Sequence, residues 1–482
     1  MKVQESGVGV LVGGEWRSRP GVPVYSPAHP SEVVGSSPAG MRADVEAAVQ
    51  AAVSAQREWG RLPLGARVDF LAGTVEPLEA EADSRAEVLA AEQGKTIHEA
   101  RLEIGFTGAI VTGFLELAIG VEERTALDSP LARVEQFRRP RGVVAAFVPS
   151  NWPVAIAALK LVPALLAGNA VVLKPNPSCP LSVVDAVGRV AAPLPAGLVN
   201  LVCGSDEEVA IPLLEHPGVD HVSFTGSIDT GVKVMKRCAR QVKSLTLELG
   251  GNDPAIVLPD ARFDRNFFDR MQSGVFATSG QVCLGIKRIY VPRGRLEEFL
   301  DGFLRSCDEL VMGDPLDPEV TLGPVHTVRQ VEKVRRMIDE AVASGASVRT
   351  VGSERPFDPE GFFVRPAVVV GLDERAELVR EEQFAPVVPV LAYDGVEEAI
   401  ERANGTRYGL GSSLWTSDEE SAYERYAPLL RAGTTFVNNH GIFAQVLTAP
   451  TGGVKQSGFG REFGAAGIHE YMTLQTVSNQ SF

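Results

Sequence analysis

Cysteine is scarce in this sequence, and the cysteines that occur stand far apart. Five are present in 482 residues, namely Cys179, Cys203, Cys238, Cys283 and Cys307, and no two form a C-x-x-C pair. The seven histidines are equally scattered and include no H-E-x-x-H motif. This spacing argues against a disulfide framework and against a cysteine or histidine metal site. We therefore expect no bound metal.

Basic clusters and long apolar runs are missing as well. The formal net charge is -15 and no run of lysine and arginine is present, which argues against nucleic acids and anionic membranes as partners. No apolar stretch reaches the ~18 residues of a membrane-spanning helix. The first residues, MKVQESGVGV, lack the apolar segment of a secretory signal. We expect a cytoplasmic protein that acts on a small molecule.

What the sequence does contain is a regular alternation of short β-branched runs and helical stretches between residues 142 and 259. Buried strands are expected at 142–149, 170–175, 198–204, 221–226 and 245–251. Each interval leaves room for one crossover helix, as in a doubly wound parallel sheet. Residues 41–118 are rich in Ala, Glu, Leu and Arg and are expected to be helical.

A second alternating region begins near residue 263. Its composition predicts strands at 288–292, 362–370, 387–393 and 434–438, and helices at 295–311, 326–344 and 395–403. The chain is therefore expected to have an α/β fold with two α/β domains. Two strand-like segments, 132–140 and 470–482, fit neither domain. They could form a small sheet, an arm that pairs with another subunit, or a solvated hairpin.

Two polar residues are expected at the carboxyl ends of neighbouring strands. Asn151 stands where a strand ends and an apolar helix begins, so it is either a helix N-cap or an amide donor toward a ligand. Lys174 ends the next strand along the chain, where its charge could hold a phosphate or a ribose hydroxyl.

Two later strand ends carry further candidates. Gly226 and Ser227 lie between a strand and a helix, where backbone N–H groups favour a pyrophosphate, although a plain helix cap would look similar. Glu248 ends an otherwise apolar strand ahead of two glycines. It is either a general base with a raised pKa or a salt-bridged strand end.

Cys283 follows a turn-like run of small residues in TSGQVCLG. A reactive cysteine needs a lowered thiol pKa, and we expect this setting to provide one. A thiol, a carboxylate and an amide are the groups needed for acyl-thioester chemistry, as nucleophile, base for water and oxyanion donor. The sequence therefore predicts an enzyme in which Cys283, Glu248 and Asn151 act together.

At this point the sequence resembles the aldehyde dehydrogenase superfamily over nearly its whole length. The shared motifs occur in the family's order: PSNWP for the usual P-W-N-F-P, VLKP, FTGS, LELGG, GQVC, EEQFAP and GGVKQSGFGRE. The resemblance implies a coenzyme-binding domain (1–125 and 141–252), a catalytic domain (253–450) and oligomerisation segments (126–140 and 465–482). It also implies a homodimer or homotetramer.

The resemblance assigns roles to individual residues. It implies Cys283 as nucleophile, Glu248 as general base and Asn151 as oxyanion donor in the NAD(P)-dependent oxidation of an aldehyde to a carboxylic acid. A thiohemiacetal and a thioester on the cysteine would be the intermediates. The coenzyme-binding residues it implies are Pro149, Lys174, Pro177, Gly226, Ser227, Leu249, Glu382 and Phe384. Trp152 and Val282 would line the substrate pocket.

The sequence departs from the family pattern at a few positions. Pro177 replaces a glutamate that would bind the adenosine ribose and repel a 2′-phosphate, so we expect NAD as coenzyme with NADP tolerated. Ser150 and Trp152 change the surroundings of Asn151, and Ala385 replaces a glycine. The apolar character of the pocket residues favours a medium-sized hydrophobic or aromatic aldehyde. Two alternatives stay open, a CoA-acylating aldehyde dehydrogenase and a non-catalytic structural or binding homologue.

Overall fold

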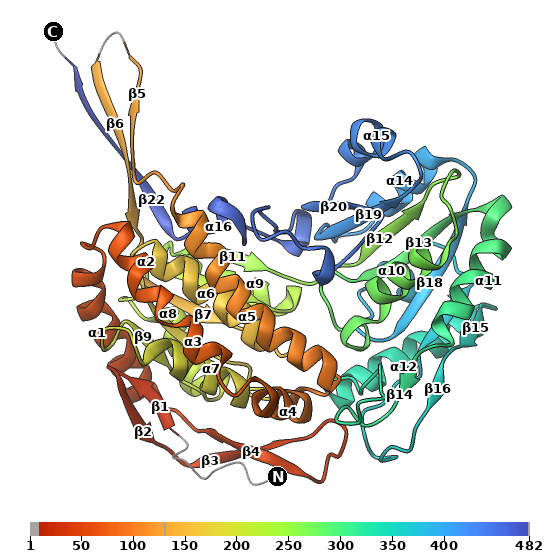
Figure 1. Ribbon diagram of the computed structural model, residues 1–482, viewed down its shortest axis with the longest axis horizontal. Helices are drawn as coiled ribbons and strands as arrows, with labels where there is room; N and C mark the ends of the chain where they lie inside the picture. Colours follow the sequence, from red (N-terminus) through yellow and green to blue (C-terminus); the bar gives the residue numbers. More distant parts are fainter. Residues whose placement is uncertain (1–8, 130–131, 481–482) are drawn as a thin grey trace.

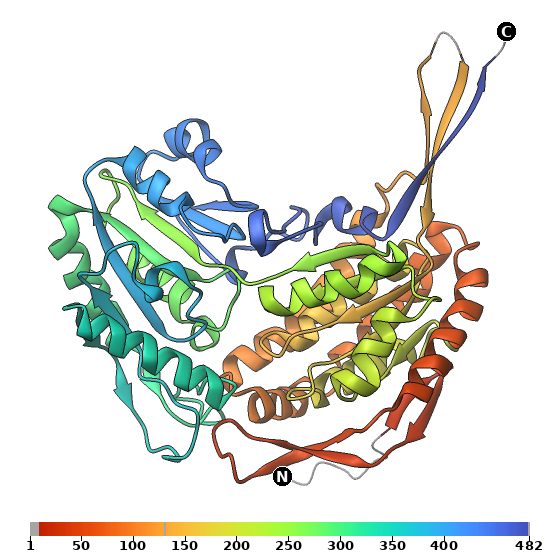
Figure 2. The same cartoon turned by 180° about the vertical axis from the view of Figure 1, so that it is seen from behind.

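The computed structural model describes residues 9–129 and 132–480. Two lobes lie side by side, each built around a mostly parallel sheet, and a thin β arm projects from one of them (Figures 1 and 2). The predicted α/β fold is therefore confirmed. None of the helices in the described residues is long and apolar enough to cross a membrane, and the cytoplasmic location stays a prediction.

The first lobe contains an eight-stranded sheet with the order β2-β1-β9-β8-β7-β10-β11-β21. The central five strands are parallel, and β1, β2 and β21 pair antiparallel. All five strands predicted between residues 142 and 251 are present here. The bounds are β1 (Gly9–Val12), β2 (Glu15–Ser18), β7 (Val143–Phe147), β8 (Ala170–Lys174), β9 (Val199–Leu201), β10 (His221–Thr225), β11 (Ser244–Glu248) and β21 (Gly458–Phe459).

The strand order of this sheet reverses between β7 and β10. The chain runs outward from β7 through β8 to β9 and then returns to place β10 on the other side of β7. Ligands of open α/β sheets bind at such a switch point, beside the carboxyl ends of the strands. Asn151 follows β7 and Ser227 follows β10, so both lie at this position.

Ten helices among the described residues accompany the first sheet along the chain. Their bounds are α1 (Arg42–Trp59), α2 (Leu64–Ala72), α3 (Val75–Glu79), α4 (Ala82–Gln93), α5 (Ile97–Ala118), α6 (Pro153–Leu166), α7 (Leu181–Ala191), α8 (Ile211–Glu215), α9 (Ile228–Cys238) and α16 (Gly464–His469). Almost every residue of α6 is buried, because its apolar side chains are packed on all sides. The residues expected to be helical, 41–118, form α1 to α5.

The second lobe contains a seven-stranded sheet with the order β15-β17-β18-β13-β12-β19-β20. The sequence did not predict β12 or β19, whose segments DPAIV and GSSLW hold residues that are rare in strands. The strand expected at 362–370 begins only at Ala367, after Pro366, because proline has no N–H for the ladder. The bounds are β12 (Asp253–Val257), β13 (Ile286–Pro292), β15 (Ser347–Thr350), β17 (Ala367–Val370), β18 (Val387–Tyr393), β19 (Gly411–Trp415) and β20 (Thr434–Val437).

The helices of the second lobe match the three that the sequence predicts and add three others. They are α10 (Arg265–Phe276), α11 (Leu296–Cys307), α12 (Val328–Ala343), α13 (Glu377–Arg380), α14 (Val396–Asn404) and α15 (Glu419–Ser421). Two small strand pairs complete the chain: β3 (Gly21–Tyr25) with β4 (Val33–Pro38), and β14 (Val311–Met312) with β16 (Ser353–Glu354).

The projecting arm is a three-stranded sheet of β5 (Arg124–Leu127), β6 (Ala132–Pro140) and β22 (Met472–Gln480), with β6 in the middle. The two segments that fit neither domain in the sequence therefore pair with each other along nine residues, from Met472 opposite Pro140 to Gln480 opposite Ala132. Residues 481–482 of the predicted tail lie outside the described residues. Leu474 and Val477 are about half exposed on the edge strand β22.

Candidate active site

One cleft brings together most of the residues that the sequence singled out. Its volume is about 1890 Å³, and it is lined by residues at the carboxyl ends of the first sheet and by residues from the second lobe. The predicted residues that line it are Pro149, Asn151, Lys174, Pro177, Gly226, Ser227, Glu248, Leu249, Cys283, Glu382 and Phe384. Trp152 and Val282, expected in the substrate pocket, do not line this cleft and are only 2% and 5% exposed.

Asn151 lies between β7 and α6, and its side chain does not cap the helix. The N-cap residue of α6 is Trp152, and its side chain makes no capping hydrogen bond. The Asn151 amide instead donates from Nδ2 to the carbonyl oxygen of Gln281, at 2.9 Å. The helix-cap alternative is therefore wrong, and the amide lies against the segment that carries Cys283.

The turn before Cys283 has an unusual backbone. Thr278, Ser279 and Gly280 all have positive φ values, of 51°, 54° and 72°. Left-handed backbone is rare for residues with a side chain and persists only where the surroundings hold it. At position 280 a Cβ would lie 2.4 Å from the carbonyl oxygen of Ala385, so this site requires glycine. The turn is thus packed against the backbone of Ala385.

The surroundings of Cys283 make its thiol a weaker acid, contrary to the expectation from the sequence. Burial, followed by the nearby carboxylates Glu382, Asp253 and Glu248, raises the pKa of the thiol to about 12. Negative charge disfavours a thiolate, and small neighbouring residues supply no compensating cation. At neutral pH the Cys283 side chain in the protein without coenzyme is therefore a neutral thiol.

Glu248 is the last residue of β11 and its carboxyl group is largely buried. Its Oε1 has no hydrogen-bond partner among the described residues, and no ion pair there involves this side chain. Burial, followed by the charge of Glu462, raises its pKa well above the usual value, while Lys160 acts in the opposite direction. A Cβ at Gly452 would lie 2.9 Å from Oε1, so glycine leaves the room that this carboxyl group occupies. The salt-bridge alternative is therefore wrong for this residue.

A buried ion pair lies behind Glu248, and it was not predicted from the sequence. The Lys160 ammonium in α6 donates to Glu462 Oε1 at 2.8 Å and to Ser223 Oγ at 2.9 Å. Tyr471 donates to the same Ser223 hydroxyl at 3.1 Å. A usable signal was present, because Lys160 is the one charged residue in the otherwise apolar helix PVAIAALKLVPALL.

The opposite end of the cleft holds polar groups with few partners. Lys174 is 4% exposed, and its ammonium makes one long hydrogen bond, 3.4 Å, to the carbonyl oxygen of Pro175. Burial lowers the pKa of Lys174, whereas the charge of Asp206 raises it. Ser227 is the N-cap of α9 and accepts from the Thr230 N–H at 3.3 Å. A buried cation short of acceptors beside a helix N-terminus suits an anionic, hydroxyl-rich ligand.

Glu382 and Phe384 also line the cleft. Burial raises the pKa of Glu382 to about 7, and its Oε1 accepts from the Gly251 N–H at 3.1 Å. Phe384 has a φ of 53°, another left-handed residue on the cleft wall. At Gly250 a Cβ would come within 2.4 Å of Glu382 Oε2, so the glycine allows the carboxylate to approach the backbone. These residues fit a nucleotide cofactor that carries ribose hydroxyls.

Comparison with known proteins identifies the family. A family model described as "Aldehyde dehydrogenase family" matches residues 16–477. Geranial dehydrogenase of Castellaniella defragrans is 36% identical over 97% of this chain and 98% of its own length. The crystal structure of betaine aldehyde dehydrogenase from Staphylococcus aureus in complex with NAD+ has a TM-score of 0.93 and 30% identity, and it covers 99% of this chain and 96% of that one.

An NADP-dependent enzyme of E. coli also superimposes, with a TM-score of 0.93, 31% identity and complete coverage of both chains. The match therefore extends over the whole chain in sequence and in structure. The chain belongs to the aldehyde dehydrogenase family, and it is an NAD(P)-dependent aldehyde dehydrogenase.

Proposed function

We propose that this enzyme oxidises an aldehyde to the free carboxylic acid through a thioester on Cys283. The observation that carries the proposal is that Cys283, Glu248 and Asn151 line one cleft, with the Asn151 amide hydrogen-bonded to the segment of the cysteine. A scaffold would need none of the three groups. Membership of an enzyme family also removes the alternative of a non-catalytic homologue.

The three residues divide the reaction between them. The Cys283 thiol loses its proton to solvent, and the thiolate attacks the carbonyl carbon. The Asn151 Nδ2 and the backbone N–H of Cys283 hold the oxygen that becomes negative. Bound NAD(P) supplies the hydride acceptor and a positive ring charge. Glu248 then takes a proton from water, which attacks the thioester and releases the acid.

Water is the proposed acceptor of the acyl group, rather than coenzyme A. Glu248 provides the base that water needs, whereas a thiol acceptor has no such requirement. The test is to run the reaction with and without coenzyme A and to separate the products. Free acid at an unchanged rate in both reactions supports the proposal, and acyl-CoA as the main product would contradict it.

For the coenzyme, we propose that Lys174 contacts the adenosine ribose, Ser227 the pyrophosphate, and Glu382 and Phe384 the nicotinamide ribose and ring. Pro149, Gly226 and Leu249 complete the wall of the same cleft. Pro177 lines it without offering a carboxylate that would repel a 2′-phosphate. Asp206 and Glu207 also line it, and their charge opposes that phosphate. We therefore propose NAD as coenzyme with NADP tolerated, at a kcat/KM ratio within about tenfold.

The proposed substrate is a medium-sized hydrophobic or aromatic aldehyde. Trp152 packs edge-on against Phe443 at a centroid distance of 6.4 Å, and Phe443 is 49% exposed. Aromatic rings also bind quaternary ammonium groups, and betaine aldehyde is the substrate named for one structural relative. However, the Lys95 ammonium already lies over the Trp152 ring, at 4.1 Å. The face of this ring is therefore not available to a cationic substrate, and the half-exposed Phe443 ring suits an apolar one, such as the geranial named for one relative.

An aldehyde panel tests the substrate proposal directly. Formation of NADH is followed by absorbance for geranial, benzaldehyde, betaine aldehyde and an aminoaldehyde, each at several concentrations. The proposal expects kcat/KM to be highest for the apolar members. A preference for the two cationic aldehydes would contradict it, and the Cys283→Ala variant is the blank for both results.

We also propose that the arm pairs with another subunit to give a homodimer or homotetramer. Strand β22 has an unpaired edge in the sheet of the arm and carries the half-exposed Leu474 and Val477. Such an edge is a template for pairing with another chain. Deletion of residues 473–482 should reduce the sedimentation coefficient to that of a smaller assembly, and an unchanged profile would contradict the proposal.

A further inference from the structure

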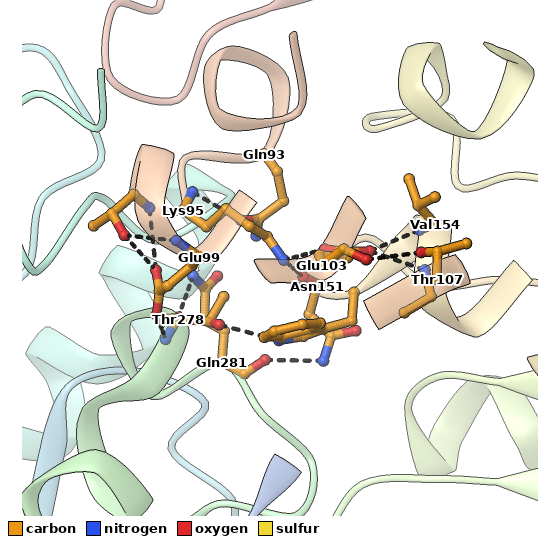
Figure 3. A network of polar contacts seen from close by, with 12 residues as sticks. Gln93, Lys95, Glu99, Glu103, Thr107, Asn151, Val154, Thr278 and Gln281 are labelled. Carbon is orange, nitrogen blue, oxygen red and sulfur yellow. Dashed lines mark hydrogen bonds and ion pairs between the residues drawn. The ribbon is translucent and has the colours of Figure 1, made fainter. Parts of the chain in front are cut away.

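A buried lysine lies next to Asn151 and outside the residues discussed so far as catalytic. Lys95 stands between α4 and α5 and is 0% exposed. Its ammonium donates to Glu103 Oε2 at 2.5 Å and to the carbonyl oxygen of Asn151 at 2.7 Å (Figure 3). The same ammonium lies 4.1 Å from the centre of the Trp152 ring. The partners of this cation are therefore the Glu103 carboxylate and the two residues that precede α6, Asn151 and Trp152.

Glu103 connects the lysine to the helix that follows Asn151. Its second oxygen, Oε1, accepts from the backbone N–H groups of Val154 and Ala155 at 2.8 and 3.1 Å. These are orphan donors at the N-terminus of α6, and no side chain at its N-cap satisfies them. A carboxylate from α5 thus caps α6, and Lys95 neutralises that carboxylate.

The first turn of α5 also reaches the turn before Cys283. Glu99 accepts from the Thr278 N–H (Figure 3), and its Oε2 accepts from the backbone N–H and the hydroxyl of Thr96, both at 3.1 Å. Trp152 Nε1 donates to Thr278 Oγ1 at 3.0 Å, and this bond joins the start of α6 to the same turn. The start of α5 therefore holds both segments that form the oxyanion site, the one with the amide and the one with the cysteine.

We propose that Lys95 is a positioning residue for Asn151. By fixing the Asn151 carbonyl oxygen and, through Glu103, the first turn of α6, it holds the Asn151 amide where Nδ2 and the Cys283 N–H face one oxygen atom. A buried ion pair alone is weak evidence for a role in stability, since an apolar pair of similar size often serves as well. What distinguishes this pair is that it contacts Asn151 and the first turn of α6, while Trp152, whose ring the ammonium covers, bonds to the turn before Cys283. The inference rests on the proposed roles of Cys283 and Asn151.

The test separates attack on a carbonyl from the reactivity of the thiol. p-Nitrophenyl acetate acylates Cys283 directly, since an S–C bond forms, the ester C–O bond breaks and p-nitrophenolate leaves. This step needs the oxyanion site but neither coenzyme nor hydride transfer. Iodoacetamide alkylates the same sulfur without developing an oxyanion. The two rates are measured at one pH for the wild type and for Lys95→Met combined with Glu103→Gln, which removes both charges and keeps an oxygen acceptor for α6.

The proposal expects the acylation rate of the double variant to fall about 100-fold, the effect typical of a displacement of 1 Å at a reacting group. The alkylation rate should stay at the wild-type value. On an Asn151→Ala background the double variant should cause no further loss of acylation, because the group that it positions is absent. Arg85→Met is the matched control, since Arg85 is a buried cation of α4 paired with Asp185, and both rates should stay unchanged.

An equal fall in acylation and alkylation would overturn the proposal, because it would show a general disturbance of the nucleophile. A full additional loss on the Asn151→Ala background would overturn it as well. Failure of the proposed function would look different, since Cys283→Ala would then keep its dehydrogenase activity. If the double variant does not fold, Lys95→Arg serves in its place. It keeps the charge, and a selective loss of acylation that Asn151→Ala abolishes is again the expected result.

Discussion

The two ends of the cleft hold their charged groups in different ways. Where the coenzyme is proposed to bind, Lys174 is buried with one long hydrogen bond, and the Ser227 hydroxyl caps a helix that is open to the cleft. Where the chemistry is proposed, the ammonium groups of Lys95 and Lys160 are each paired with a carboxylate and a second acceptor. One part leaves its cation free for a ligand, whereas the other pairs its cations before the ligand arrives.

This difference predicts how tolerant each end is to substitution. Removing one partner of a buried ion pair leaves an uncompensated charge, which lowers the free energy of unfolding by about 3–5 kcal/mol. A change at the coenzyme end removes a contact with a ligand and affects the coenzyme-free protein little. Substitutions where the chemistry is proposed should therefore reduce turnover strongly. Substitutions where the coenzyme is proposed to bind should change only the affinity for the coenzyme and the choice between NAD and NADP.

The largest expected effect is at the nucleophile. Cys283→Ala should abolish dehydrogenase activity, because no other described residue of the cleft carries a thiol. Coenzyme binding, measured by the quenching of intrinsic fluorescence, should be retained, since the alanine leaves the other end of the cleft unchanged. Substantial NADH formation by the variant would show that another residue is the nucleophile.

A smaller loss is expected at the base. Glu248→Gln keeps the shape of the side chain but cannot take a proton from water, so the thioester should accumulate. We expect a burst of about one NADH per active site in rapid mixing, followed by turnover reduced roughly 100- to 10,000-fold. Turnover near the wild-type rate would mean that Glu248 is structural.

The pH dependence of the thiol gives a third test, on the protein without coenzyme. The thiol pKa is raised to about 12, so the reactive thiolate is a minor form at neutral pH and increases as the pH rises. Inactivation by iodoacetamide should accelerate about tenfold per pH unit between about pH 7 and 9, with no plateau. A plateau below about pH 8 would show that the thiolate is already stabilised.

The smallest effect is expected at the coenzyme end. Pro177→Glu should lower kcat/KM with NADP by up to about tenfold, roughly 1.4 kcal/mol, through repulsion of the 2′-phosphate, and should leave NAD almost unaffected. Pro177→Gln is the matched control without the charge. A thousandfold preference of the wild type for either coenzyme would mean that other residues, such as Asp206, dominate the choice.

Much of the first lobe could be predicted because each strand end there leaves a local pattern. A β-branched run followed by Asn151, Lys174, Ser227 or Glu248 marks the carboxyl edge of a parallel sheet, and the structure brings these residues to one cleft. The strands β12 and β19 were missed because their sequences have little strand propensity. Both are interior strands of the second sheet, and tertiary packing gives them that position.

The paired cations could not be predicted in the same way. Lys95 and Glu103 stand in a stretch rich in charged residues, and nothing in their spacing distinguishes them from an exposed helix face. The direction of the Cys283 pKa was also predicted wrongly, because Glu382 and Asp253 are distant in the sequence and approach the thiol only in the folded chain. The sequence pattern shows where a functional side chain lies along the chain. The charges around that side chain depend on how the chain folds.

The carboxylates around Cys283 also bear on how long the protein survives between turnovers. Oxidants such as peroxide react with the thiolate and start the path to sulfenic and then irreversible sulfinic acid. With the thiol held neutral, the resting enzyme keeps its nucleophile in the form that oxidises slowly. The protein without coenzyme should therefore lose this thiol to peroxide slowly at neutral pH and faster as the pH rises.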